Sequence, residues 1–255
     1  MELAGRVALV TGGATGIGRA TVLQLARSGV AGVAINYRTS SQDAENLAAE
    51  VVQIGSNAIC VNADVQDDNQ VREMTETVGR HFGRLDVLVN NAGITHWVPF
   101  ADLEGLTDAV WDEILDVNVK GAFRCTRAAA PWLSQAQGVV INISSLSGIL
   151  ATNMVSSIAY GTAKAALIYL TRALAIALAP NVRVNAVAPA FTDTRWIQDH
   201  YGARYPEVVA QAASVIPLHR IATPEEVAAA IVSLVIGGDF VTGQTLVVDG
   251  GLSLS

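Results

Sequence analysis

The chain has 255 residues, of which 51% are hydrophobic and 15% are charged, so it can bury a sizeable core and is not a disordered chain. Its formal net charge of −7 argues against a nucleic-acid partner, because binding to phosphates needs clustered Lys and Arg. The most apolar stretches, Ala173–Ala179 and Val227–Ile236, fall short of the roughly 18–20 residues that cross a bilayer, which argues against membrane insertion.

Residue types that bind metals or form disulfides are few and scattered. Cys60 and Cys125 form no CxxC or metal-ligand spacing, which is typical of reduced thiols in the cytoplasm. The four histidines form no HExxH pattern. The first residues run directly into a glycine-rich turn, without a basic leader or a cleavage site. We therefore expect a cytoplasmic protein without a metal site.

Short runs rich in Val, Ile and Ala predict β-strands, and segments with helical periodicity separate them. The runs are apolar at nearly every position, as expected for parallel strands covered by helices on both faces. This alternation predicts a doubly wound, Rossmann-type α/β fold with about seven strands, formed by residues 1–255 as a single domain. The strand candidates are Val7–Val10, Gly32–Asn36, Ala58–Asn62, Val87–Asn90, Val139–Ile143, Arg183–Val187 and Thr245–Val248, and the helical segments include Arg19–Ser28, Asp43–Ile54 and Val71–Phe82.

The one irregular stretch covers about residues 191–217, between the sixth predicted strand and the helix that Pro224 opens. In an open α/β sheet, ligands bind beyond the carboxyl ends of the strands. A long segment at this edge could form a lid over the substrate. It contains Trp196, His200, Tyr201 and Tyr205.

A glycine-rich turn follows the first predicted strand and opens the first helix. It reads Thr11-Gly12-Gly13-Ala14-Thr15-Gly16-Ile17-Gly18, with the spacing GxxxGxG. Glycines let the backbone approach a pyrophosphate, and the free N–H groups at the helix start favour its negative charge. A turn of this kind can also be no more than a tight connection. The predicted cofactor contacts here are Gly12, Thr15, Gly16, Ile17 and Gly18.

The end of the second predicted strand indicates which nucleotide is bound. An acidic residue there would bind the ribose 2′-hydroxyl, whereas a nearby arginine accepts a 2′-phosphate. This chain reads Tyr37-Arg38-Thr39, without a carboxylate. The planar guanidinium of Arg38 can donate two parallel hydrogen bonds to a phosphate, although Arg38 could also be an ordinary solvated side chain. The pattern favours NADP(H) over NAD(H).

Tyr160 and Lys164 are four residues apart at the start of an apolar helical run, so their side chains share one helix face. A tyrosine with its ordinary pKa of about 10 is a poor acid/base near neutral pH. A neighbouring ammonium group favours the phenolate and brings the pKa toward the working pH. As an isolated pair, such residues are often structural, so the interpretation depends on the rest of the chain.

Other motifs give that context. The strand Val139–Ile143 ends in Ser144-Ser145, and Asn90-Asn91-Ala92-Gly93 closes the fourth predicted strand. Near the C-terminus the chain reads Phe240-Val241-Thr242-Gly243-Gln244, followed by Val248-Asp249-Gly250-Gly251. With the glycine turn and the YxxxK pair, these motifs occur in the order typical of the short-chain dehydrogenase/reductase family. The chain resembles this family over essentially its whole length, and within it the 3-oxoacyl-carrier-protein reductases.

The resemblance implies a catalytic tetrad of Asn118, Ser145, Tyr160 and Lys164. Ser145 would hydrogen-bond the substrate oxygen, Tyr160 would give or take its proton, and Lys164 would hold the nicotinamide ribose. Asn118 would anchor a water molecule that relays protons through Lys164. The remaining cofactor contacts that the resemblance implies are Asp64 and Val65 at the adenine, Asn91, Ala92 and Gly93 along the groove, and Pro189, Thr192 and Thr194 at the nicotinamide.

This chain departs from the family pattern at two places. Ala190 follows Pro189, where the family usually has glycine. Ser145 and Tyr160 are 15 positions apart, about two more than usual, so Ser144 and Ser147 are rival candidates for the catalytic serine. We prefer Ser145 because it aligns from the preceding strand, and an insertion belongs in a loop.

We considered three alternatives to a reductase of small ketones or alcohols. A dinucleotide-binding regulator without chemistry would typically lose the tyrosine or the lysine. An extended-type epimerase or dehydratase would have a TGxxGxxG turn and a longer C-terminal domain. A 3-oxoacyl-carrier-protein reductase would need basic residues near the pocket to meet an acidic carrier, and Pro131–Gln137 contains none.

The two segments Trp111–Leu133 and Ile158–Leu178 look too apolar for burial on one side only. An outer helix of a doubly wound sheet has one face on the strands, so an apolar opposite face needs a partner. Neighbouring helices of the same chain could supply it, but pairing of identical helices about a two-fold axis is the commonest solution. The family resemblance also implies a homotetramer built through these helices.

Overall fold

The computed structural model describes residues 1–151 and 156–254. Within these residues, parallel strands form a seven-stranded sheet in the order β3-β2-β1-β4-β5-β6-β7. The predicted doubly wound α/β architecture is therefore confirmed. The strands are β1 (Val7–Val10), β2 (Gly32–Tyr37), β3 (Asn57–Asn62), β4 (Val87–Asn90), β5 (Val139–Ile143), β6 (Arg183–Pro189) and β7 (Thr245–Val248).

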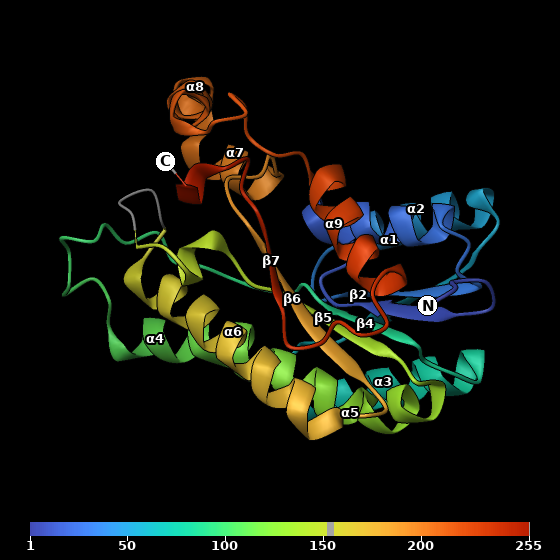
Figure 1. Ribbon diagram of the computed structural model, residues 1–255. Helices are drawn as coiled ribbons and strands as arrows, with labels where there is room; N and C mark the ends of the chain where they lie inside the picture. Colours follow the sequence, from blue (N-terminus) through green and yellow to red (C-terminus); the bar gives the residue numbers. More distant parts are fainter. Residues whose placement is uncertain (152–155, 255) are drawn as a thin grey trace.

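Helices cover both faces of the sheet (Figure 1). One layer contains α1 (Gly16–Arg27), α2 (Ser41–Ile54) and α9 (Pro224–Ile236). The opposite layer contains α3 (Asp68–Phe82), α4 (Asp108–Leu115), α5 (Ala122–Ala136) and α6 (Ile158–Leu178).

The strands are apolar at successive positions because each one contributes to two cores. Neighbouring residues of a strand point to opposite faces of the sheet. Val10 and Ile35 pack into the core beneath α1, α2 and α9, whereas Leu9 and Ala34 pack into the core beneath α3, α5 and α6. All four side chains are fully buried. This two-sided burial explains why the sequence shows continuous apolar runs rather than alternation.

The strand order reverses at β1, which pairs with β2 on one side and β4 on the other. The connections from β1 and β4 therefore leave the sheet in different directions, and a crevice opens between them at their carboxyl ends. The backbone N–H of Thr11 donates to Val89 O at 3.0 Å and holds the two strand ends together. A ligand site is expected at this point of the fold.

The segment 191–217, which the sequence pattern leaves irregular, contains two helices. They are α7 (Arg195–Tyr201) and α8 (Tyr205–Val215), and they lie beyond the strand ends (Figure 1). Gly202, with φ of +49°, interrupts the helical path between them. The prediction of irregular structure was therefore wrong, because each helix is too short to show a clear apolar period.

Helix α6 has a large exposed face. Tyr169 and Ile176 are 73% and 81% exposed, although Leu167 and Leu174 on the opposite face are buried against the sheet. Helix α6 has 21 residues and a mean hydropathy of 1.3, so by length and composition alone it could cross a membrane. The apolar stretch is thus longer than the sequence pattern suggested. Within residues 1–151 and 156–254, no neighbouring helix covers Tyr169 or Ile176 on this outer face.

Candidate active site

A cleft of about 1220 Å³ opens where the strands β1, β4, β5 and β6 end. Loops that follow these strands form its floor, and residues of α7 and α8 form part of its wall. Most of the residues selected from the sequence come together here although they are far apart along the chain. The selected residues that line it are Gly12, Thr15, Gly16, Ile17, Asn91, Ala92, Gly93, Ser145, Tyr160, Lys164, Pro189, Thr192 and Thr194.

The glycine-rich turn has the close-packed backbone that its sequence suggests. Gly12 and Gly16 have φ values of +57° and +54°, which side chains rarely allow. A Cβ at Gly18 would clash with the carbonyl oxygen of Gly12, so only glycine lets α1 begin so close to the turn. Thr15 precedes α1, and its hydroxyl makes no capping bond among the described residues. The first N–H groups of α1 are therefore available to an anion in the cleft.

Asn91 holds the glycine turn in place. Its side-chain Nδ2 donates to Thr11 O at 3.1 Å and to Gly12 O at 2.9 Å. In return, the Thr11 hydroxyl accepts the backbone N–H groups of Asn91 and Ala92 at 3.0 and 3.1 Å. The ends of β1 and β4 are thus joined by side chains as well as by the sheet. Asn91 both lines the cleft and positions the phosphate-binding turn.

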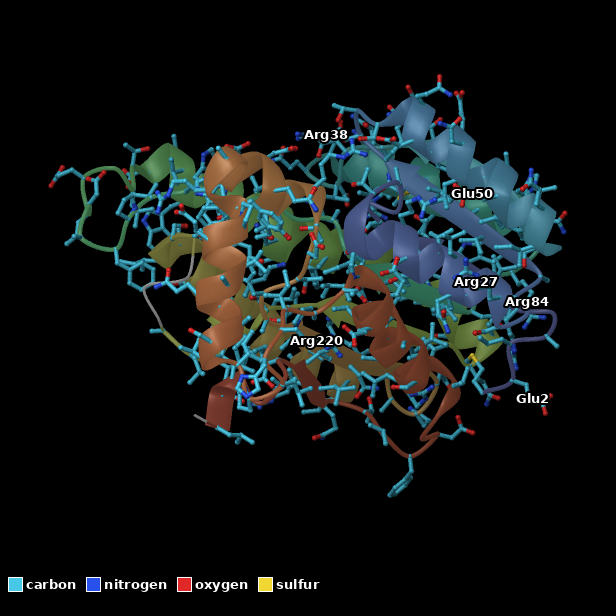
Figure 2. The ribbon with its side chains drawn as sticks, turned by 90° about the horizontal axis from the view of Figure 1, so that it is seen from above. Glu2, Arg27, Arg38, Glu50, Arg84 and Arg220 are labelled. Atoms are coloured by element: carbon cyan, nitrogen blue, oxygen red, sulfur yellow. The ribbon has the colours of Figure 1, made fainter. Side chains whose placement is uncertain are left out.

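The predicted adenosine contacts lie outside the cleft wall. Arg38 is at the surface beside the start of α2 (Figure 2), and its Nη1 lies 3.5 Å from Asp64 Oδ2. The guanidinium side chain is 52% exposed, so it can turn toward a ligand. Val65 is buried and faces the backbone of Gly121 rather than the cleft. Ser40, which sequence reasoning missed, does line the cleft where α2 begins. Of the selected residues, Gly18, Tyr37, Arg38, Thr39, Asp64, Val65 and Asn118 do not line it.

Helix α6 brings Tyr160 and Lys164 to one side of the cleft. Lys164 Nζ lies 5.4 Å from the centre of the Tyr160 ring and donates to Ile143 O at 2.9 Å. Burial lowers the pKa of Lys164 to about 8. Burial raises the pKa of Tyr160 to about 12, and a hydrogen bond with the Ser145 hydroxyl acts in the opposite direction. The phenol is thus protonated at neutral pH. The expectation that Lys164 brings the pKa of Tyr160 toward neutral pH was wrong, because burial of the phenol has the larger effect.

The three candidate serines have different environments. Ser145 hydrogen-bonds Tyr160. Its Oγ also accepts the Ser147 N–H at 3.1 Å and lies 3.5 Å from Pro189 O. The buried Ser144 hydroxyl donates to Lys164 O at 2.8 Å, so it fixes the backbone of α6. The geometry favours Ser145 over Ser144. Part of the enlarged loop before Tyr160 lies outside the described residues.

Asn118 lies behind the cleft in a π-helical turn, Asp116–Gly121, between α4 and α5. Its Nδ2 donates to Ile94 O and to Ile114 O, both at 2.9 Å. Its buried Oδ1 has no hydrogen-bond partner within the described part of the chain. A Cβ at Gly93 would lie 2.8 Å from this oxygen and 3.5 Å from Lys164 Nζ. Glycine at 93 therefore keeps open the space that joins the amide oxygen to the ammonium group.

The segment after β6 closes the cleft on the side of the glycine turn. Ala190 keeps a negative φ, and its N–H donates to Val248 O at 2.9 Å, so alanine is accommodated where the family usually has glycine. A Cβ at Gly16 would lie 3.6 Å from the Thr194 methyl group. Arg195 lines the cleft, and its guanidinium lies 3.7 Å from Asp43 in the first turn of α2. Sequence reasoning missed Arg195 because only the fold brings α7 near α2.

Aromatic side chains line the other end of the cleft. Trp97, which sequence reasoning missed, and Trp196 both line the cleft, and their ring centres are 6.5 Å apart. Trp196 also meets the Tyr160 ring edge-on, with ring centres 6.1 Å apart.

Within residues 1–151 and 156–254, no group of three or more His, Cys, Asp or Glu side chains could hold a metal ion.

Known proteins are similar to this chain over nearly its whole length. Residues 12–253 match the family model for enoyl-(acyl carrier protein) reductase. The chain is 42% identical to ketoacyl reductase 2 assigned to the granaticin polyketide synthase of Streptomyces violaceoruber, over 97% of this chain and 96% of that protein. It is 38% identical to the 3-oxoacyl-[acyl-carrier-protein] reductase FabG of Thermotoga maritima, over 99% of both chains.

A crystal structure from Burkholderia xenovorans, assigned to the short-chain dehydrogenases/reductases, has the same fold with a TM-score of 0.91. The two proteins are 33% identical, and the match covers 98% of this chain and 99% of that one. The chain belongs to the short-chain dehydrogenase/reductase family of oxidoreductases, which act on alcohols and ketones.

Proposed function

We propose that the protein is a cytoplasmic, NADP(H)-dependent ketone reductase in which Tyr160 is the general acid. The observation that carries this proposal is the contact group of Tyr160, Ser145 and Lys164 at the wall of one large cleft. Asn118 lies behind this contact group, and Gly93 leaves open the space between Asn118 Oδ1 and Lys164 Nζ.

The cleft fits a nicotinamide dinucleotide. The uncapped start of α1 and the backbone of Gly12 and Gly16 suit a pyrophosphate, which needs N–H donors and close backbone approach. Thr192 and Thr194 would hold the nicotinamide end, and Lys164 its ribose. When bound, the dinucleotide supplies the hydride.

The side chains of this protein supply the proton and orient the carbonyl. Ser145 donates a hydrogen bond to the substrate oxygen, and Tyr160 transfers its phenolic proton to that oxygen as it becomes an alkoxide. The ammonium group of Lys164 stabilises the phenolate that forms. A water molecule held by Asn118 Oδ1 and Lys164 Nζ would return a proton through the space beside Gly93, because no described residue donates a hydrogen bond to this buried oxygen.

Arg38 supports the preference for NADP(H). No carboxylate directly follows β2, and among the described residues the exposed guanidinium of Arg38 makes one long ion-pair contact, with Asp64. A 2′-phosphate would give this guanidinium a better partner, because charged bidentate hydrogen bonds are stronger than a single contact of 3.5 Å. Arg195 would close the same end of the cleft, since it reaches Asp43 from α7.

The relatives favour a second candidate, reduction of 3-oxoacyl groups on a carrier protein, because that activity is named for the Thermotoga maritima relative. The lack of Lys and Arg in Pro131–Gln137 does not count against it, because this segment ends α5 at the edge where the strands begin, away from the cleft. The exposed apolar face of α6 supports a homotetramer. Light scattering at micromolar concentration tests the assembly, and a mass near 26.6 kDa would contradict it.

Initial rates with NADPH and NADH test the function, against a panel of free ketones and a 3-oxoacyl thioester. The proposal expects NADPH oxidation with free ketones at higher kcat/KM than NADH oxidation. Turnover of the 3-oxoacyl thioester, without turnover of any free ketone, would favour the second candidate. No oxidation of either nucleotide with any substrate would contradict both.

A further inference from the structure

The residues around Tyr160 also restrict the class of ketone. Trp196 is 44% exposed although it is a large apolar side chain at the wall of the cleft. Its ring meets that of Tyr160 at an interplanar angle of 73°, with ring centres 6.1 Å apart. The group that gives the proton is therefore flanked by an indole that is not covered by the protein.

A second indole faces the same space. Trp97 follows β4, lines the cleft and lies 6.5 Å from Trp196 at an angle of 64°. His200 of α7 stacks on Trp97 with ring centres 3.6 Å apart and an angle of 7°. This stack supports one face of Trp97 from α7. The indole rings of Trp97, after β4, and Trp196, in α7, thus lie close to each other beside Tyr160.

Charged side chains are few in the wall of the cleft. Among the described residues that line it, Lys164 and Arg195 are the charged side chains, and Arg195 reaches toward Asp43 of α2. Apolar residues that line the same cleft include Ile94, Leu150, Ile197 and Val215. An apolar ring can be buried among such residues without the loss of hydration that a charged group suffers.

We propose that the substrate is a ketone with an aromatic ring close to its carbonyl, and that Trp97 and Trp196 receive this ring. The inference rests on the proposed function and adds the substrate class to it. Aromatic rings gain attraction from offset or edge-to-face contacts beyond the area that they bury. A saturated ring of the same size gains only burial, so the indoles distinguish the two.

The test compares 1-phenylpropan-2-one with 1-cyclohexylpropan-2-one. These ketones have the same number of heavy atoms, and neither carbonyl is conjugated with the ring. Hydrophobic burial alone would not favour the phenyl compound, because the saturated ring is at least as apolar. Ring contacts predict a kcat/KM about 2- to 12-fold higher for the phenyl ketone. Trp196→Leu should bring this ratio to about 1, whereas Trp196→Phe should keep most of it.

Phe240→Leu is the matched control, because Phe240 is fully exposed and does not line the cleft. It should keep the wild-type ratio. Thermal unfolding and circular dichroism check that each variant is folded. Tryptophan fluorescence gives the Kd of both ketones for the enzyme with oxidised cofactor, which needs no turnover.

A wild-type ratio of 1 or below, or a ratio unchanged in Trp196→Leu, would overturn the inference. In that case, turnover of both ketones would leave the proposed function intact. If neither ketone is reduced, the panel of other ketones still decides the proposed function, and the Kd values decide the inference separately. Equal Kd values for the two ketones would then refute it.

Discussion

Raising the pH above 8 should weaken productive NADPH binding, because Lys164 loses its proton there. Burial lowers the pKa of this lysine from the ordinary 10.5 to about 8, a difference of about 3 kcal/mol. At pH 9, about one-tenth of the molecules would keep the charge, compared with about 97% for a solvated lysine. The value of kcat/KM for NADPH should therefore be about tenfold lower at pH 9 than at pH 7. Tyr160 does not cause this fall, because its pKa is about 12.

The assay measures initial rates at varied NADPH and saturating ketone, from pH 6.5 to 9.5 at constant ionic strength. The protein should not unfold over this range. Between pH 8 and 10.5 the unfolded chain binds more protons at Lys164 than the folded one, so this group makes stability rise with pH. Urea unfolding should show this contribution in the wild type but not in Lys164→Met. A change in kcat/KM of less than twofold between pH 7 and 9 would refute the assigned role of Lys164.

Two further substitutions test other parts of the account. Arg38→Asp should reverse the nucleotide preference, because it removes a donor to the 2′-phosphate and offers the 2′-hydroxyl an acceptor; unchanged KM values for NADPH and NADH would contradict this. Asp86→Asn should destabilise the fold by about 3–5 kcal/mol, because it removes one partner of a buried ion-pair cluster. The fully buried Asp86 carboxylate accepts hydrogen bonds from Arg6 at 2.7 Å, from Arg84 at 2.6 and 2.7 Å and from the Val7 N–H at 2.9 Å. Burial would raise the pKa of Asp86, but these bonds outweigh it and lower the pKa, so the contribution is present above pH 3.8 and is lost as the pH falls further. A melting temperature lowered by less than about 3 °C would show that the cluster matters little, since 1 kcal/mol corresponds to about 2–4 °C at this size.

The sheet could be predicted from the sequence because two-sided burial leaves a strong local signal. The bounds of β1, β4, β5 and β7 agree with the predicted runs. The strand β3 begins at Asn57, one residue before the predicted start, because it is an edge strand whose ends are polar and exposed. Pairing with β2 defines its first residue, and the apolar pattern does not.

The site could be predicted in part. The glycine-rich turn could be predicted from its own sequence. The YxxxK pair could be assigned to catalysis only together with the other motifs of the family. Trp97 and Arg195 gave no such signal, because their places in the cleft depend on how α7 lies over the strand ends. The residues assigned to the adenosine lie outside the cleft wall, and their contacts with the cofactor stay a prediction. The role of Asn118 came from the resemblance, since a π-helical turn has no clear local pattern.

The substitution Tyr160→Phe tests the central claim most directly, because it removes the phenolic oxygen and keeps the ring that packs near Trp196. We expect kcat to fall by about 100-fold or more, since general acid–base catalysis contributes roughly 10²–10⁴-fold. The Kd for NADPH should stay within a few-fold of the wild-type value, because the contacts of the glycine turn and Lys164 remain. A variant that keeps more than about one-tenth of the wild-type kcat would contradict the assignment of Tyr160 as the general acid.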